Sequence, residues 1–138
     1  NNDLLFFKND LNNVDLNNDI ENIDSLNNQL HIIDKNLKIK GIKLIVLPGP
    51  DKFSLYHPYM INKSIYTKPD FLNKLSKLKK EYLYIDSKNV LSKQLKDQKD
   101  IYFYDDSHWS PWASKIIAKE IEKIIDEDKV KILTTNPQ

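Results

Sequence analysis

The stretch Gly41-Ile42-Lys43-Leu44-Ile45-Val46-Leu47-Pro48-Gly49-Pro50 decides the fold class of this chain. Residues 42–47 are apolar except for Lys43, which is typical of a central strand covered on both faces. The following Pro-Gly-Pro ends that strand. Before it, apolar residues recur at spacings of three and four over 20–37, which predicts a helix with one buried face that ends at Gly41. A helix, a tight turn and a buried strand indicate an α/β layered domain.

The rest of the chain continues the alternation of helices and strands. Further strands are expected at 4–7, 82–85, 101–104 and 130–133. Further helices are expected at 68–80, at 87–95 after a cap at Asp86 or Ser87, and from Pro111 onward after a cap at Ser110. Residues 9–18 are predicted to form a polar loop, and 53–67 an aromatic, irregular one. We expect a single domain over residues 1–138, as a portion of a longer protein, because the chain does not begin with Met.

Composition excludes several classes of function. The formal net charge of the 138 residues is +1, so no strong field favours nucleic acid or an anionic membrane. The chain contains no cysteine, which excludes disulfides and thiolate metal sites. No apolar run is long enough to span a membrane, and no signal peptide is visible. We expect no cofactor.

The candidate catalytic side chains lie in the sequence YDDSHWSP, residues 104–111. A strand is expected to end before it and a helix to begin at its end, and ligands of α/β sheets usually bind at the carboxyl ends of strands. Asp105 and Asp106 lie three and two residues before His108. A carboxylate at that spacing can hydrogen-bond the imidazole, fix its tautomer and stabilise the imidazolium. Two other interpretations of His108 remain open: a loop histidine whose hydrogen bonds are satisfied by a helix cap, and a metal ligand together with Asp105 and Asp106. For Trp109, packing in the protein and binding of a sugar both remain open.

The segment DDSHWSPWASKIIAKEI resembles the D-x-H-W-[ST]-P-x-G-A signature of the AlgX/AlgJ-type SGNH-hydrolase-like family, and is similar to the related DHHW group. Upstream, LLFF followed by NDLNN resembles the family's opening strand and loop, and LIVLPGPDKFSLY resembles its apolar strand followed by P-x-K-x-x-x-Y. The resemblance covers most of the chain. One departure is Trp112-Ala113, which stands where the family usually has Gly-Ala.

The resemblance implies a fold and an activity. The fold is a three-layer SGNH or flavodoxin-like domain with a mainly parallel sheet and helices on both faces, present here as a partial domain. The family's activity is extracytoplasmic O-acetyl transfer, or acetyl-ester hydrolysis, on exopolysaccharides. The partners implied are a polysaccharide and an acetyl donor, which a membrane acyltransferase could supply, and the location implied is periplasmic or cell-surface.

Site residues carry over from the resemblance by position. Asp106 and His108 match the D-x-H acid–base pair, whereas the D-x-x-H of ordinary SGNH esterases would select Asp105. Lys52 and Tyr56 match the recurrent loop, and we place them with His57 and Trp109 among the candidate substrate-binding residues. For Lys52 and His57, a plain loop role stays open.

The family's serine nucleophile is not found. It lies downstream of the histidine in a G-[DT]-S-[FY] turn, and this chain has no such turn. Either the serine lies beyond Gln138 in a longer protein, or the protein lacks it. The first hypothesis is therefore a serine-type acetyltransferase or esterase that uses His108 as its base. The alternatives are a non-catalytic glycan-binding or scaffold domain and a metal-dependent hydrolase.

Overall fold

The computed structural model describes residues 4–97 and 100–135, with side chains up to residue 127. Its helices are α1 (Lys8–Asn12), α2 (Val14–Asn17), α3 (Ile20–Ile39), α4 (Lys52–Tyr56), α5 (Phe71–Lys77), α6 (Ser87–Gln94) and α7 (Pro111–Thr135). Its strands are β1 (Ile45–Val46) and β2 (Leu83–Tyr84), and two 3-10 turns are η1 (His57–Tyr59) and η2 (Lys63–Ile65). Within the described residues, no helix is both long and apolar enough to cross a membrane.

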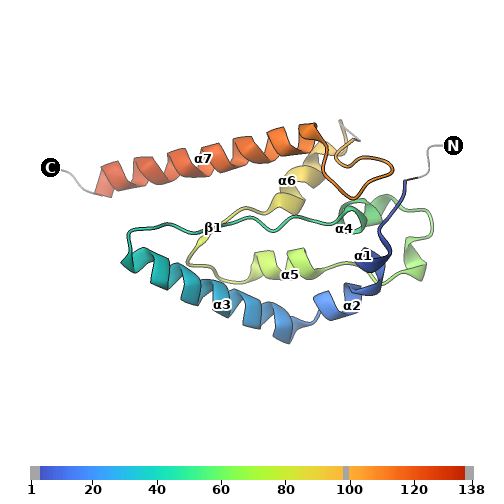
Figure 1. Ribbon diagram of the computed structural model, residues 1–138, viewed down its shortest axis with the longest axis horizontal. Coiled ribbons are helices and arrows are strands. Elements are labelled where there is room, and N and C mark those ends of the chain that lie inside the picture. The colour runs from blue at the N-terminus through green and yellow to red at the C-terminus, as the bar shows by residue number, and fades with distance from the viewer. Residues whose placement is uncertain (1–3, 98–99, 136–138) are drawn as a thin grey trace.

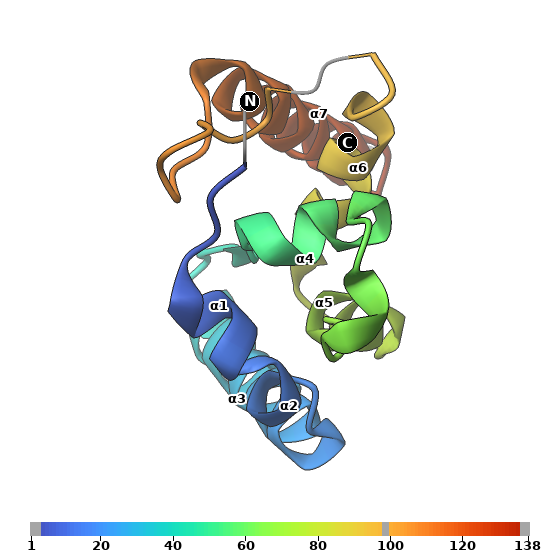
Figure 2. The same cartoon turned by 90° about the vertical axis from the view of Figure 1, so that its right-hand side faces the viewer.

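The two strands form a small parallel sheet between layers of helices. Ile45 lies opposite Leu83 and Val46 opposite Tyr84. In Figure 1, β1 runs between α7 on one side and α3 on the other. Figure 2 shows α6 and α7 on one side of α4, with α3 and α5 on the other. The α/β class is therefore confirmed, in the form of a partial α/β domain whose strands are shorter than the predicted 42–47 and 82–85.

Helix α3 begins and ends where the sequence predicts. The Asp19 side chain accepts a hydrogen bond from the backbone N–H of Glu21 at 2.9 Å, which caps the first turn. At the other end Gly41 has a φ of 72°. Its N–H bonds to the carbonyl of Lys38, and the next N–H bonds to that of Leu37, each at 3.0 Å. This pair of bonds is the Schellman motif, which favours glycine because of its left-handed backbone.

The face that α3 buries differs from the predicted apolar stripe. Ile23, Asn27 and Asp34 are buried, whereas Leu26 and Ile33 are exposed. The polar members of the buried face are satisfied: Asn27 accepts the Tyr82 hydroxyl at 2.6 Å, and Asp34 pairs with Lys38 at 2.6 Å. The helix packs against α5, and its hydrogen bonds reach the segment after α5, at Lys79, Glu81 and Tyr82. Part of its apolar stripe stays uncovered.

The main core joins α4, α6 and α7. It contains Leu55, Leu91, Leu95, Ile101, Tyr102, Ala113 and Ile117. Ala113 and Ile117 lie on the buried side of α7. α6 is capped by Asp86, which accepts from the N–H of Asn89 at 3.0 Å, and not by Ser87. The core thus lies directly beneath the segment that connects α6 to α7.

Three predicted elements between residues 4 and 67 are wrong, and a fourth, the helix expected at 68–80, is present but shorter. Residues 4–7 do not pair with a strand. The backbone N–H of Leu5 donates one hydrogen bond to the carbonyl of Tyr104. The expected polar loop 9–18 is folded into α1 and α2, and the loop 53–67 begins inside α4 and continues through η1 and η2. The Asp51 side chain, which accepts from the N–H of Ser54 at 2.6 Å, starts α4. Helix 68–80 is shorter than predicted, at Phe71–Lys77.

Two predicted strands in the C-terminal half are also wrong. Residues 101–104 contribute a single antiparallel bridge between Tyr102 and Trp109 instead of a strand. Residues 130–133 lie within α7. No glycine or proline interrupts the chain between Pro111 and Thr135, so the helix continues where an apolar cluster suggested a strand.

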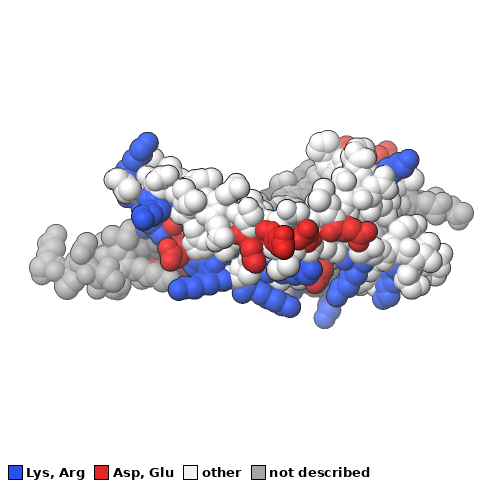
Figure 3. Space-filling model, turned by 90° about the horizontal axis from the view of Figure 1, so that it is seen from below, with Lys and Arg blue, Asp and Glu red and all other residues white. Residues whose placement is uncertain are grey.

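Acidic and basic side chains lie beside each other on the surface. Figure 3 shows the face seen from below, with a row of acidic side chains next to lysines. This mixture agrees with the near-zero net charge of the chain.

Candidate active site

The motif residues form a closed turn at the start of α7. Tyr102 and Trp109 pair across its base, where Phe103 donates to the carbonyl of His108 at 3.3 Å and Ser110 donates to that of Ile101 at 2.9 Å. The Ser110 hydroxyl then caps α7 by accepting from the N–H of Ala113 at 3.3 Å. The predicted helix start is confirmed. We refer to residues 103–108 as the motif turn.

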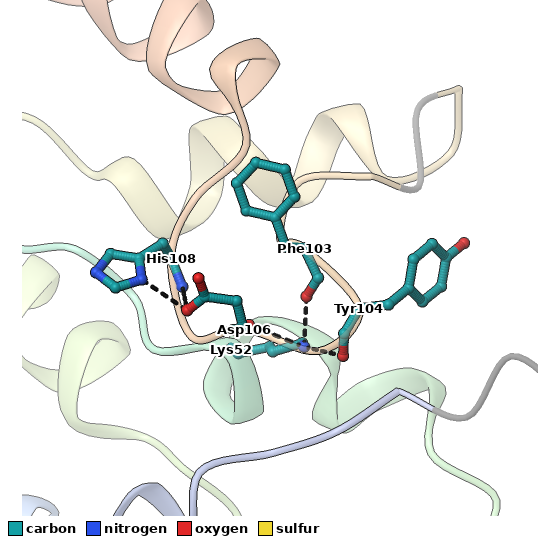
Figure 4. A network of polar contacts seen from close by, with 5 residues as sticks. All are labelled: Lys52, Phe103, Tyr104, Asp106 and His108. Atoms are coloured by element: carbon teal, nitrogen blue, oxygen red, sulfur yellow. Dashed lines mark hydrogen bonds and ion pairs between the residues drawn. The ribbon is translucent and has the colours of Figure 1, made fainter.

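Asp106 and His108 form a hydrogen-bonded pair on the motif turn. Oδ1 of Asp106 lies 2.6 Å from Nδ1 of His108 and also accepts the His108 backbone N–H at 3.1 Å (Figure 4). The hydrogen bond from the ring lowers the pKa of the Asp106 carboxyl. With Nδ1 donating to the carboxylate, Nε2 keeps its lone pair and can accept a proton. The His108 side chain is 80% exposed, so a reacting group can approach it.

The geometry follows the D-x-H spacing. Among the described residues, the carboxylate that hydrogen-bonds the imidazole is that of Asp106. Asp105 is exposed, and its charge acts on Lys52. Within the same residues, no group of three His, Asp or Glu side chains is arranged to hold a metal ion.

Lys52 lies beneath the motif turn and is almost fully buried, with 1% of its surface exposed. Its Nζ donates to the carbonyls of Phe103 at 2.6 Å, Tyr104 at 2.8 Å and Asp106 at 3.1 Å (Figure 4). Burial lowers the pKa of Lys52, while the carboxylates of Asp105 and Asp106 act in the opposite direction. In this arrangement the ammonium bonds the protein's own backbone, in place of the substrate contact expected from the sequence.

Trp109 packs under the motif turn. Its indole Nε1 donates to the Tyr102 hydroxyl, which donates in turn to the carbonyl of Pro50. The indole ring also covers Gly49 so closely that a Cβ there would lie 3.0 Å from Cζ2. The structure thus places Trp109 in a packing role, which was one of the two interpretations of this residue.

Tyr56 and His57 are consecutive, but their side chains lie in different surroundings. Tyr56 accepts the backbone N–H of Tyr102 at 3.4 Å and lines an open groove together with Leu4, Phe6, Tyr59, Met60 and Tyr66. His57 is buried, with its ring 5.3 Å from that of Phe53 in an edge-to-face contact. Burial lowers the pKa of His57. Its Nε2 has no hydrogen-bond partner among the described residues.

Sequence reasoning missed the contribution of Gly49, Pro50 and Tyr102. All three belong to segments interpreted as strand ends or core, yet they hold the base of the motif turn. The available signal was Pro48-Gly49-Pro50 itself, since a glycine between prolines after a strand often marks a close approach of another segment.

Among the described residues, no serine hydroxyl is hydrogen-bonded to the His108 ring, whose side-chain partner is Asp106. The hydroxyl of Ser54 donates to Asp51 at 2.8 Å, and that of Ser87 donates to the carbonyl of Pro48. Ser110 caps α7. The structure therefore presents a base and its orienting acid without a nucleophile paired to them.

An aspartate–histidine pair on the turn before a helix of a partial α/β domain agrees with the class of SGNH hydrolase-like domains, to which the family comparison assigns the chain. A comparison with protein-family models matches residues 2–138 to the family described as SGNH hydrolase-like domain, acetyltransferase AlgX. The chain belongs to this family. Comparisons with curated proteins and with solved structures gave no significant match.

Proposed function

We propose that this chain supplies the acid–base half of a serine-type enzyme that transfers acetyl groups to, or removes them from, a cell-surface polysaccharide. The observation that carries this proposal is the 2.6 Å contact between Asp106 and His108 on an exposed turn, in a chain of the AlgX acetyltransferase family. The family supports acetyl transfer, and the geometry supports a histidine base oriented by a carboxylate.

The chemistry proceeds in two steps. In the first, His108 Nε2 takes the proton of a serine hydroxyl while the serine oxygen attacks the acetyl carbonyl; the proton then passes to the departing donor oxygen, and an acetyl-serine remains. In the second, His108 takes a proton from a sugar hydroxyl or a water molecule, whose oxygen attacks the acetyl-serine. The bond from the acetyl carbon to the serine oxygen then breaks, and His108 returns the proton to that oxygen. Asp106 orients the ring and stabilises the imidazolium in both steps. We place the serine outside these 138 residues.

The partners and the location of this reaction follow from the same proposal. The acceptor is a polysaccharide hydroxyl, the donor is an acetyl ester, which a membrane acyltransferase could supply, and the site of action is extracytoplasmic. The membership of the AlgX family supports these assignments.

A second candidate is a non-catalytic glycan-binding or scaffold domain. Two observations favour it: no described serine hydroxyl is hydrogen-bonded to the His108 ring, and Tyr56, Tyr59 and Tyr66 line an open groove. Tyrosine rings combine an apolar face with a hydroxyl, which suits contact with sugars.

Hydrolysis of an acetyl ester such as p-nitrophenyl acetate by the longer gene product tests the enzyme. We expect His108→Ala to lower kcat by about 100-fold or more, since general base catalysis contributes about 10²–10⁴-fold. Asp106→Asn should also lower kcat, and Asp105→Asn is its matched control, because it removes a neighbouring exposed carboxylate that does not bond the ring.

Three outcomes contradict the proposal in different ways. Equal activity of His108→Ala and wild type would remove His108 from the mechanism. A larger loss for Asp105→Asn than for Asp106→Asn would select the D-x-x-H spacing instead. An inactive longer protein that still binds acetylated polysaccharide would favour the glycan-binding candidate.

A further inference from the structure

We propose that Lys52 is the positioning residue of the Asp106–His108 pair, and that its buried ammonium sets the shape of the motif turn on which both side chains stand. The inference relies on the proposed function for the catalytic role of the pair. The contacts that support it come from the structure alone, and its test needs no activity.

The first support is the convergence of three carbonyls on one nitrogen. An ammonium has three N–H donors and no acceptor. Lys52 directs these donors to the carbonyls of Phe103, Tyr104 and Asp106, at 2.6, 2.8 and 3.1 Å. Three carbonyls within four consecutive residues therefore point toward the same interior atom, which closes the turn around it. The third carbonyl belongs to the residue whose side chain holds the imidazole.

The second support is the position of the Lys52 hydrogen bonds within the motif turn. Oδ1 of Asp106 accepts both the ring and the backbone N–H of His108, a double contact that requires residues 106 and 108 to keep one relative orientation. Bonds across Tyr102 and Trp109 fix the base of the turn. The Lys52 bonds fix its first half, up to residue 106.

The third support is the free-energy cost of burying the Lys52 ammonium. Removing an ammonium from water is unfavourable unless its hydrogen bonds are replaced. An apolar side chain of similar length at position 52 would leave three turn carbonyls without this donor. Relaxation of the turn toward solvent would then satisfy the carbonyls and move Asp106 with them.

Lys80 provides a matched control in the same chain. Its Nζ also donates to three carbonyls, those of Leu75 at 2.5 Å, Ser76 at 3.1 Å and Leu78 at 2.7 Å. Burial lowers its pKa as it does for Lys52. These carbonyls lie at the end of α5, and none belongs to the motif turn. Lys80→Met therefore removes the same kind of interaction without touching the Asp106–His108 pair.

The experiment is NMR of the 138-residue chain with ¹⁵N-labelled histidine and ¹³C-labelled aspartate. In wild type we expect neutral His108 to carry its proton on Nδ1, and Asp106 to titrate below its ordinary pKa of 3.8. In Lys52→Met, His108 should shift toward the tautomer with the proton on Nε2, and the pKa of Asp106 should rise toward 3.8. In Lys80→Met both signals should remain as in wild type, even where urea unfolding shows lower stability.

The absence of cysteine permits a rescue experiment. Lys52→Cys can be alkylated with bromoethylamine in the unfolded state, which places an amine at nearly the same distance from the backbone, and then refolded. The alkylated protein should regain the wild-type signals of His108 and Asp106, whereas the unmodified variant should not.

Each further outcome has a defined meaning. A folded Lys52→Met with wild-type signals overturns the proposal, as does an equal disturbance in Lys80→Met. If the Lys52 variants do not fold, the exchange of the Lys52 ammonium protons with water is measured in the wild-type protein. Slow exchange supports the buried contacts, and rapid exchange overturns the proposal. Intact positioning in an inactive longer protein would reject the enzyme but not the role of Lys52.

Discussion

At the residue scale, the motif turn and its base are held mainly by one short segment, 48–56, in addition to the bond from Leu5 to the carbonyl of Tyr104. Lys52 holds its carbonyls from below, and Pro50 accepts the Tyr102 hydroxyl at its base. Gly49 leaves the space that the Trp109 indole fills. Asp106 and His108, the proposed acid–base pair, are exposed, while Lys52, Pro50 and Tyr102 are buried.

Gly49→Ala should displace the Trp109 ring. The added Cβ would lie 3.0 Å from Cζ2 of the indole, and both groups are held by backbone or hydrogen bonds. We expect a loss of about 1–3 kcal/mol in the free energy of unfolding, as for other overpacked sites. Urea unfolding measures the loss, and the indole N–H resonance of Trp109 should shift because its bond to Tyr102 is strained.

Gly41→Ala is the control for this substitution. Nothing lies within 4 Å of a Cβ at Gly41, but its φ of 72° disfavours alanine by about 1–2 kcal/mol. This variant should lose stability without shifting the Trp109 resonance. An unshifted resonance in Gly49→Ala would show that the ring is free to move away.

At the scale of elements, the five-residue helix α4 connects the sheet to the motif turn. Such a short helix is not stable alone, so its cap matters. Asp51 accepts both the N–H of Ser54 at 2.6 Å and its hydroxyl at 2.8 Å. Lys52 is the first residue of α4, and the cap therefore determines where its side chain starts.

Asp51→Ala should lower stability by about 1 kcal/mol, the usual cost of losing an N-cap, and should also shift the Trp109 and His108 resonances. Asp51→Asn, which keeps a capping oxygen, should stay close to wild type. Asp86→Ala removes the equivalent cap of α6 and should cost a similar amount without affecting the motif turn. If Asp51→Ala shifts neither resonance, α4 does not determine the position of the turn.

Predictability from sequence followed the strength of local signals. The 20-residue helix α3, with a cap at Asp19 and Gly41 after its end, could be placed closely, as could the start of α7 at Pro111. Spacing also indicated a carboxylate partner for His108, and the family resemblance favoured Asp106 over Asp105. By contrast, residues 4–7 and 101–104 have strand-like composition but gain no neighbouring strand, and pairing is a property of the whole fold. The buried position of Lys52 could not be foreseen, because lysine is rarely buried.

At the scale of the whole molecule, two helical layers enclose a sheet that has two short strands within residues 4–97 and 100–135. The cores on the two sides differ: one is apolar and joins α4, α6 and α7, and the other combines Ile23 with the Asn27–Tyr82 hydrogen bond. Buried ionisable groups in such a small domain make its stability depend on pH.

Stability should fall on mild acidification because of His57. Burial lowers its pKa below the ordinary 6.5, and the neighbouring Lys63, Lys68 and Lys88 charges add to this effect. The unfolded chain therefore binds this proton at a higher pH than the folded chain, and stability is lost as pH falls from about 7 through the folded-state pKa. Urea midpoints across this range should decrease in wild type and change less in His57→Phe. Equal slopes in both proteins would contradict this assignment.

The length of α7 has a mechanical consequence. A helix of 25 residues extends about 37 Å, and its first residue follows His108 by only three positions. A tilt of about 5° around the Ser110 cap moves the far end by about 3 Å. Because the Ser110 cap joins α7 to the turn that carries His108, such a tilt would act on the backbone that positions the imidazole.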